Sequence, residues 1–135
     1  MSRAVARRRS GMAHTVDIDG HQLITDELPE DGGADEGIRP TRLLAVSLAS
    51  CTATTIAMYA DRKEWDIEGL EVAVEFDGTP PLGEKARFGI EVTIPEGLDD
   101  DQRARIMVVA GKCPVHRMLI EGSDVELGES ESGAG

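Results

Sequence analysis

An uncharged stretch, LLAVSLASCTATTIAMYA, runs from Leu43 to Ala60 and has Cys51 at its centre. Several of its side chains recur at intervals of four and three residues, which places them on one face of an α-helix. Pro40 suits the first turn of such a helix, where the missing N–H has no partner to lose. The charged run at 61–64 returns the chain to solvent, so the sequence predicts one long helix that starts near Pro40. The residues on the shared face are Leu44, Leu48, Cys51, Thr55 and Met58.

The opposite face of this helix also lacks charge, and a helix without a charged face is normally buried on all sides. A membrane span is the alternative at this length. We favour a soluble protein, because serine and threonine dilute the apolar run and the rest of the chain has a soluble composition. A chain of 135 residues holds little other material to cover such a helix. We therefore expect a homodimer with this helix near its centre, and no membrane partner.

The length of 135 residues is typical of one domain, which we assign to residues 1–135. There are 26 acidic and 14 basic residues, and the net charge of −12 disfavours nucleic acid and anionic membranes as partners. A salt-adapted protein and an ordinary acidic protein both fit this composition. We find no secretory or lipidation signal and expect a cytoplasmic protein. In that compartment two cysteines are more often reactive or metal-binding than joined in a permanent disulfide.

Alternating apolar residues predict strands on both sides of the central helix. Asp19-Gly20 separates two short β-prone runs and is typical of a tight hairpin turn. After the helix, apolar residues alternate in 70–76 and again in 86–94, with turn-forming residues between them. These two runs predict an antiparallel pair of strands. The basic residues at 1–10 are expected to form a strand or a solvated tail.

The last part of the chain predicts further helices. Asp99, Asp100 and Asp101 favour a helix N-terminus, and Gly111 is expected to end that helix. Pro114 begins another short helical turn. Residues 123–129, SDVELGE, are a candidate final strand, and 128–135 are expected to be a frayed end. The order of strands, long helix, strands and helix is typical of the α+β class.

The two cysteines differ in what their surroundings do to a thiol. Cys113 is expected at the N-cap of the helical turn that Pro114 begins, where backbone N–H groups and the helix dipole favour a thiolate. Cys51 lies in mid-helix, where a buried thiol stays protonated unless a cation approaches it. Spacing alone therefore points to Cys113 as the nucleophile. The simpler interpretation of Cys51 is a small core residue, since buried free cysteines are common.

A metal site is a weaker interpretation. His116 follows Cys113 at Cys-x-x-His spacing, and Cys51 would be a third ligand, with His14 or His21 as the fourth. No paired Cys-x-x-Cys occurs, so we expect no metal and no cofactor. Neither Gly-x-Ser-x-Gly nor Gly-Lys-Ser/Thr occurs, which leaves a serine hydrolase or a phosphate-binding loop without support.

The segment RPTRLLAVSLASCTATTIAMYADRKEW, followed by KCPVHRML, resembles the OsmC/Ohr family of osmotically inducible and organic hydroperoxide resistance proteins. The Met-Tyr-Ala-Asp-Arg-Lys run is most similar to the OsmC-like subgroup. The resemblance implies an α+β fold in which antiparallel sheets surround a long central helix. It also implies an intertwined homodimer with active sites at the subunit interface.

In that family the first cysteine is peroxidatic and the second resolving, which reverses the assignment from spacing. The resemblance implies a thiol-dependent peroxidase, an antioxidant of the oxidative stress response. Cys51 would reduce an organic hydroperoxide, become a sulfenic acid and condense with Cys113 to a disulfide. A dithiol, lipoyl-type in the Ohr branch, would then reduce this disulfide. The alternative is a non-peroxidatic member that binds a small apolar or thiol-bearing ligand at the dimer interface.

Family members activate the first cysteine with an arginine from the N-terminal strands and a glutamate at the start of the central helix. Matching VDIDG to the family's hairpin places the arginine near Arg8 or Arg9, and we take Arg9. Subgroup members commonly carry Pro-Thr-Glu-Leu-Leu where this chain has Pro-Thr-Arg-Leu-Leu at 40–44. Two hypotheses follow: Arg42 stabilises the Cys51 thiolate itself, or the site is weak.

Overall fold

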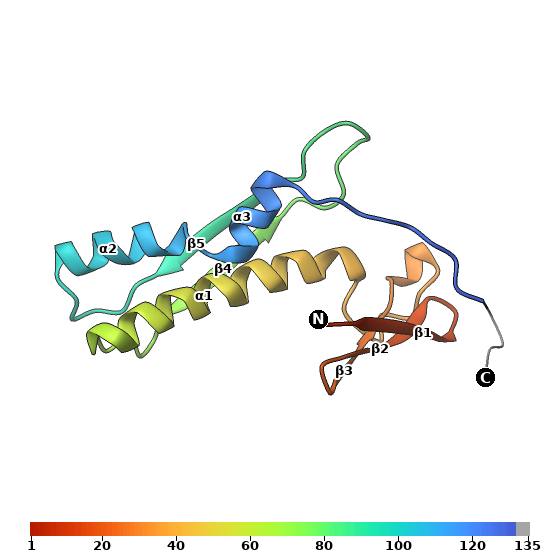
Figure 1. Cartoon of the computed structure of the whole chain (residues 1–135), viewed down its shortest axis with the longest axis horizontal. Coiled ribbons are helices and arrows are strands. Elements are labelled where there is room, and N and C mark those ends of the chain that lie inside the picture. The colour runs from red at the N-terminus through yellow and green to blue at the C-terminus, as the bar shows by residue number, and fades with distance from the viewer. Residues whose placement is uncertain (132–135) are drawn as a thin grey trace.

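The computed structural model describes residues 1–131 and has the expected α+β architecture (Figure 1). A three-stranded antiparallel sheet lies beyond the N-terminal end of a long helix, α1, and a two-stranded sheet and two shorter helices lie along α1 itself. The elements are β1 (Ala4–Ser10), β2 (Ala13–Ile18), β3 (His21–Thr25), α1 (Leu43–Lys63), β4 (Glu71–Phe76), β5 (Phe88–Thr93), α2 (Asp100–Ala110) and α3 (Pro114–Glu121), with 3-10 turns at Pro29–Asp31 and Pro40–Arg42.

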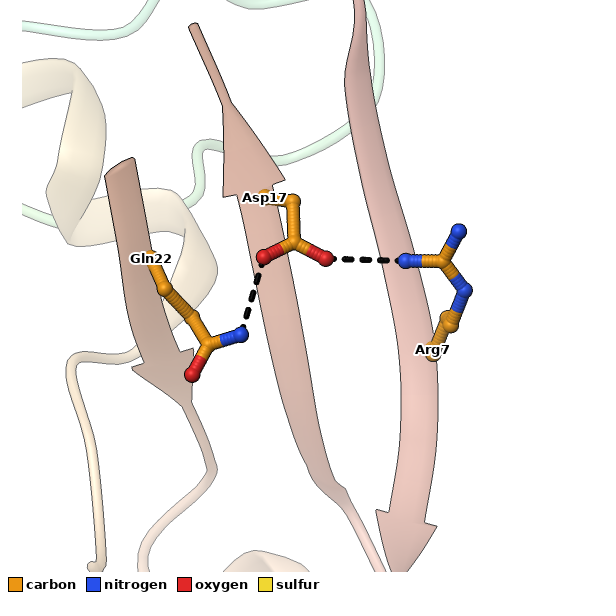
Figure 2. Close-up of polar contacts among 3 residues, drawn as sticks. All are labelled: Arg7, Asp17 and Gln22. Atoms are coloured by element: carbon orange, nitrogen blue, oxygen red, sulfur yellow. Dashed lines mark hydrogen bonds and ion pairs between the residues drawn. The ribbon is translucent and has the colours of Figure 1, made fainter. Parts of the chain in front are cut away.

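The N-terminal sheet has the order β1-β2-β3 and contains the predicted hairpin. Asp19 and Gly20 both adopt positive φ angles, 48° and 81°, as a two-residue turn between twisted strands requires. The basic N-terminus forms strand β1 rather than a tail. Arg7 Nη1 lies 2.8 Å from Asp17 Oδ2, and Gln22 Nε2 donates to the other Asp17 oxygen, so one carboxylate links all three strands (Figure 2).

The loop from β3 to α1 is organised by the buried carboxylate of Asp26. Its oxygens accept hydrogen bonds from the backbone N–H groups of Glu27 at 2.8 Å and of Ala34 and Glu36 at 3.1 Å. The N–H of Glu27 contributes most to holding the pKa of Asp26 below its ordinary value. This loop, rather than a deep core, covers the carboxylate. The loop then leads the chain back towards Pro40 and α1.

Helix α1 begins after the turn at Pro40, as predicted, and ends at Glu64, whose φ of 59° and N–H bonds to the Ala60 and Asp61 carbonyls terminate it. One face is buried against β4 and the shorter helices. In a single chain Met58 is 63% exposed and other apolar residues of α1 also face solvent, so burial on all sides requires the expected second subunit and stays a prediction. The buried residues are Leu48, Thr52, Ile56 and Ala60.

The segment Pro40–Lys63 is long enough for a membrane span, and an 18-residue window of it has a mean hydropathy of 1.6 and is 22% buried in this chain. A long core helix of a soluble protein has the same length and composition. Hydropathy alone therefore does not separate the two interpretations.

Strands β4 and β5 pair antiparallel and alternate between half-buried and exposed residues, as predicted. The rings of Phe76 and Phe88 stack with centroids 4.8 Å apart at the far end of this pair. The core lies between this sheet, α1 and α2, around the buried Ile56, Ile106 and Ala110. The half-buried residues packed on it are Trp65, Ile67, Leu70, Val72, Val92, Ile94 and Leu98.

Helix α2 starts at a capping box. The Asp99 carboxylate accepts from the Gln102 N–H, and the Gln102 side chain accepts from the Asp99 N–H, both at 2.8 Å. Gly111 follows the helix, and Cys113 is the N-cap of α3, with Pro114 in the first turn, as predicted. Helix α3 continues to Glu121 and is longer than the single turn expected.

The predicted final strand at 123–129 does not form. Residues 122–131 have no regular secondary structure, Val125 and Leu127 are exposed, and no strand within residues 1–131 pairs with this segment. The expected frayed end at 128–135 lies partly outside the described residues, which stop at 131.

Candidate active site

The fold brings the two cysteines together. Cys51 lies in the middle of α1, Cys113 lies at the N-cap of α3, and the two side chains are close enough for each to shift the pKa of the other. Both are free thiols. Cys113 is 0% exposed, whereas Cys51 is only partly buried. Cys113 is therefore fully covered, whereas Cys51 is the more exposed residue of the pair.

Their proximity makes the two thiols unequal acids. Burial raises the pKa of Cys51, and the neighbouring Cys113 side chain raises it further. Burial also raises the pKa of Cys113, but the neighbouring Cys51 side chain and the backbone N–H of His116 outweigh it and lower the net pKa. The hydroxyl of Thr52 approaches closely enough to contribute, although without regular hydrogen-bond geometry. In one chain, the first proton is therefore lost from Cys113.

No basic side chain of residues 1–131 is among the main influences on the Cys51 pKa. Arg9 belongs to β1, in the sheet beyond the start of α1, so a single chain does not bring it to Cys51 (Figure 1). Arg8 donates to the Gly11 carbonyl of its own hairpin, and Arg7 is paired with Asp17. Within residues 1–131 of one chain, the activating arginine that the resemblance implies does not lie beside the thiols.

Arg42 does not replace that arginine. Its guanidinium lies 5.5 Å from the centroid of the Phe76 ring and donates to the Thr41 hydroxyl at 2.9 Å. Nine residues of helix at 1.5 Å each separate it from Cys51 by about 13 Å along the axis. The hypothesis that Arg42 stabilises the Cys51 thiolate within one chain is therefore wrong, because its charge faces the aromatic end of β4.

A half-open cavity of about 760 Å³ lies between α1, β5 and α3. Its lining is mostly apolar, with Lys85 and Glu121 among the lining residues that are exposed. Leu48 lies three residues before Cys51 on α1, and His116 lies three residues after Cys113 on α3, so the inner wall is one helical turn from each thiol. The lining is Leu44, Leu48, Lys85, Ala86, Phe88, Ile90, His116, Leu119, Ile120, Glu121 and Gly122.

Sequence reasoning did not find this cavity. The alternation of Ala86, Phe88 and Ile90 predicted a strand face, and Leu44 and Leu48 a helix face, but neither pattern shows that the faces stand apart. His116 was considered only as a metal ligand. Within residues 1–131, no three histidine, cysteine or acidic side chains gather as a metal site, so the interpretation with Cys51, Cys113 and His116 has no support there.

Comparison with known proteins matches residues 32–128 to the family model described as OsmC-like protein. An osmotic stress induced and detoxification response protein from Psychrobacter arcticus is 28% identical, with 84% of this chain and 85% of that chain covered and a TM-score of 0.72. An OsmC like protein from Mycoplasma pneumoniae is 25% identical, with 89% and 86% covered and a TM-score of 0.71.

An organic hydroperoxide resistance protein OsmC from Legionella pneumophila is 21% identical, with 87% and 88% covered and a TM-score of 0.65. At that identity the likeness shows the fold alone. No curated protein sequence matches the chain. These matches confirm the fold class that the resemblance implied.

Proposed function

This chain belongs to the OsmC-like family, and we propose that it is a thiol-dependent peroxidase that reduces organic hydroperoxides. The observation that carries the proposal is the pair of free thiols, Cys51 and Cys113, which lie close enough to shift each other's pKa and one helical turn from an apolar cavity. One structural relative is named an organic hydroperoxide resistance protein, which agrees with this chemistry. An apolar cavity favours binding of an alkyl hydroperoxide over hydrogen peroxide, because the alkyl group is transferred out of water.

Cys51 is the attacking sulfur in this proposal, because it is the more accessible of the two. Its thiolate attacks the distal peroxide oxygen, the O–O bond breaks, and the alkoxide takes up a proton and leaves as an alcohol. The resulting Cys51 sulfenic acid condenses with the Cys113 thiol, which forms the disulfide and releases water. A dithiol reductant, of lipoyl type in the Ohr branch, then restores both thiols by exchange.

We further propose that the active form is a cytoplasmic homodimer. The face of α1 turned away from its own core carries small and apolar residues, which would pack closely against the same helix of a second copy. A second copy would also bring another β1 strand, and we propose that its Arg9 supplies the missing cation at Cys51. The exposed residues of this face are Val46, Ser47, Ser50, Thr54, Ala57 and Met58.

A second function is favoured by one observation, the lack of a cation at Cys51. Arg42 stands where subgroup members commonly have glutamate, and an arginine at Cys51 would then lack its usual acidic partner. In that case the cavity would bind a small apolar or thiol-bearing ligand without peroxidase turnover.

The two functions are separated by oxidising the reduced protein with cumene hydroperoxide and with hydrogen peroxide and mapping the cysteines by mass spectrometry. The peroxidase predicts rapid loss of both thiols into a Cys51–Cys113 disulfide, faster with the organic peroxide. Cys113→Ser should instead stop at a Cys51 sulfenic acid, and Cys51→Ser should react slowly. Oxidation of the wild-type protein at the rate of a free thiol would refute the peroxidase and leave the ligand-binding function.

A further inference from the structure

His116 is the one charged or titratable residue of the cavity lining whose side chain is not exposed. The other such residues of the lining, Lys85 and Glu121, are exposed to solvent. The Nδ1 atom of His116 is buried and has no hydrogen-bond partner among residues 1–131. A buried ring nitrogen without a partner is costly unless something absent from the isolated chain completes it.

The backbone of His116 is already part of the thiol site. Its N–H contributes to the lowered pKa of Cys113, so the residue joins the cysteine pair and the cavity through one position of α3. Helix α3 fixes this arrangement, because Cys113 is its N-cap and His116 lies in its first turn. A ligand in the cavity would therefore contact His116, whose backbone N–H acts on Cys113, and would lie one helical turn from the thiol pair.

We propose that His116 is the proton carrier of the peroxidase reaction, and this inference rests on the proposed function. The imidazole accepts the proton that the cysteine pair loses when its first thiol ionises. After the Cys51 thiolate has attacked the distal oxygen, the imidazolium gives that proton to the alkoxide oxygen, which leaves as the alcohol. The two proton transfers cancel, and the histidine ends the step neutral, as it began.

This role matters only for a leaving group that needs a proton. An alkyl hydroperoxide expels an alkoxide, which is a strong base, whereas a peracid expels a carboxylate, which leaves without protonation. General acid catalysis accelerates the first kind of step and hardly affects the second. The two classes of oxidant therefore separate a proton carrier from a residue that only shapes the site.

The test compares wild-type protein, His116→Gln and a control, His21→Gln, which changes an exposed histidine of β3. Rates of thiol oxidation are measured by stopped flow with cumene hydroperoxide and with peracetic acid. We expect His116→Gln to lose about a hundredfold in rate with cumene hydroperoxide and at most about threefold with peracetic acid. The control should match the wild type with both oxidants, and free imidazole should restore part of the cumene hydroperoxide rate of His116→Ala.

Equal losses with both oxidants would assign His116 a structural role and overturn the proposal, as would unchanged rates with both. The retained peracid rate also reports that the variant is folded. If the wild type itself reacts with cumene hydroperoxide no faster than a free thiol, the peroxidase function fails first and the proton carrier fails with it. If the wild type reacts rapidly with cumene hydroperoxide and His116→Gln reacts at the same rate, only the inference about His116 is refuted.

Discussion

Replacing Cys51 with alanine should make Cys113 a weaker acid. In the wild type the neighbouring Cys51 side chain lowers the pKa of Cys113, as a hydrogen bond from its thiol would, and so opposes the cost of burying a thiolate. Hydrogen bonds to charged groups contribute about 1.5–3 kcal/mol, and about 1.4 kcal/mol corresponds to a factor of ten in an equilibrium constant. Below the pKa of Cys113, the thiolate fraction should therefore fall about ten- to a hundredfold in Cys51→Ala.

The thiolate is measured directly by its ultraviolet absorbance during a pH titration, which avoids the poor access of reagents to the buried Cys113. Cys51→Ser is the matched control, because it also removes the sulfur but keeps a hydroxyl donor at nearly the same place. We expect the serine variant to lie between the wild type and the alanine variant. An alanine variant that ionises at the same pH as the wild type would show that the hydrogen bond does not set the acidity of Cys113.

Ile56→Ala should lower the free energy of unfolding by about 2–5 kcal/mol and Ile56→Val by about 1 kcal/mol, measured by denaturant titration, because this side chain is fully buried in the core. Asp26→Asn should make the free energy of unfolding depend less on pH in the acid range. Backbone N–H groups, that of Glu27 first, lower the folded pKa of Asp26, so its contribution is present above the ordinary value of 3.8 and is lost as pH falls through the lower folded pKa. A variant whose thermal unfolding keeps the wild-type pH dependence would contradict this. Arg42→Gln should leave the alkylation rate of Cys51 unchanged, because the guanidinium lies on Phe76, and a slowed rate would return Arg42 to the thiol site.

The elements that could be predicted from the sequence are those whose cause is local. Asp19-Gly20 sets a hairpin through two positive φ angles, and Asp99 with Gln102 caps α2 through their own backbone groups. The alternation in 70–76 specifies which face of β4 is covered, whatever lies against it. In each case the residues that determine the structure are neighbours in the chain.

The predictions that the sequence leaves wrong or open concern contacts with distant or missing partners. The alternation in 123–129 fits a strand, but a strand needs a neighbour, and none lies beside Val125 and Leu127. Residues 1–10, expected as a strand or a tail, form β1 because β2 pairs with it. The uncharged surface of α1 indicated burial on all sides with a second subunit as cover, and one chain covers a single face, so the rest stays a prediction. Pairing and burial depend on what else is present, which local patterns do not encode.

In the candidate site, too, local features could be predicted from the sequence and contacts between distant residues could not. Spacing placed Cys113 at a helix N-cap, as the structure does, but the neighbouring Cys51 side chain lowers the pKa of Cys113 more than either backbone N–H group does. The contact between Cys51 and Cys113 joins α1 to α3 across 62 residues, the difference between positions 51 and 113, and only the family resemblance implied it. The cavity was not predicted because it arises from the angle between elements.

The isolated chain holds its two thiols in a state that cannot serve both steps of a peroxidase cycle well. The stronger acid, Cys113, is fully covered, and the accessible sulfur, Cys51, keeps its proton. A positive charge beside Cys51 would reverse that order, because it favours the thiolate on the nearer sulfur and moves the shared proton to Cys113. The proton would then already lie on the thiol that the later condensation requires. Since neither Arg42 nor Arg9 reaches Cys51 within one chain, a subunit that covers α1 and contributes a cation would complete the helix surface and the chemistry together.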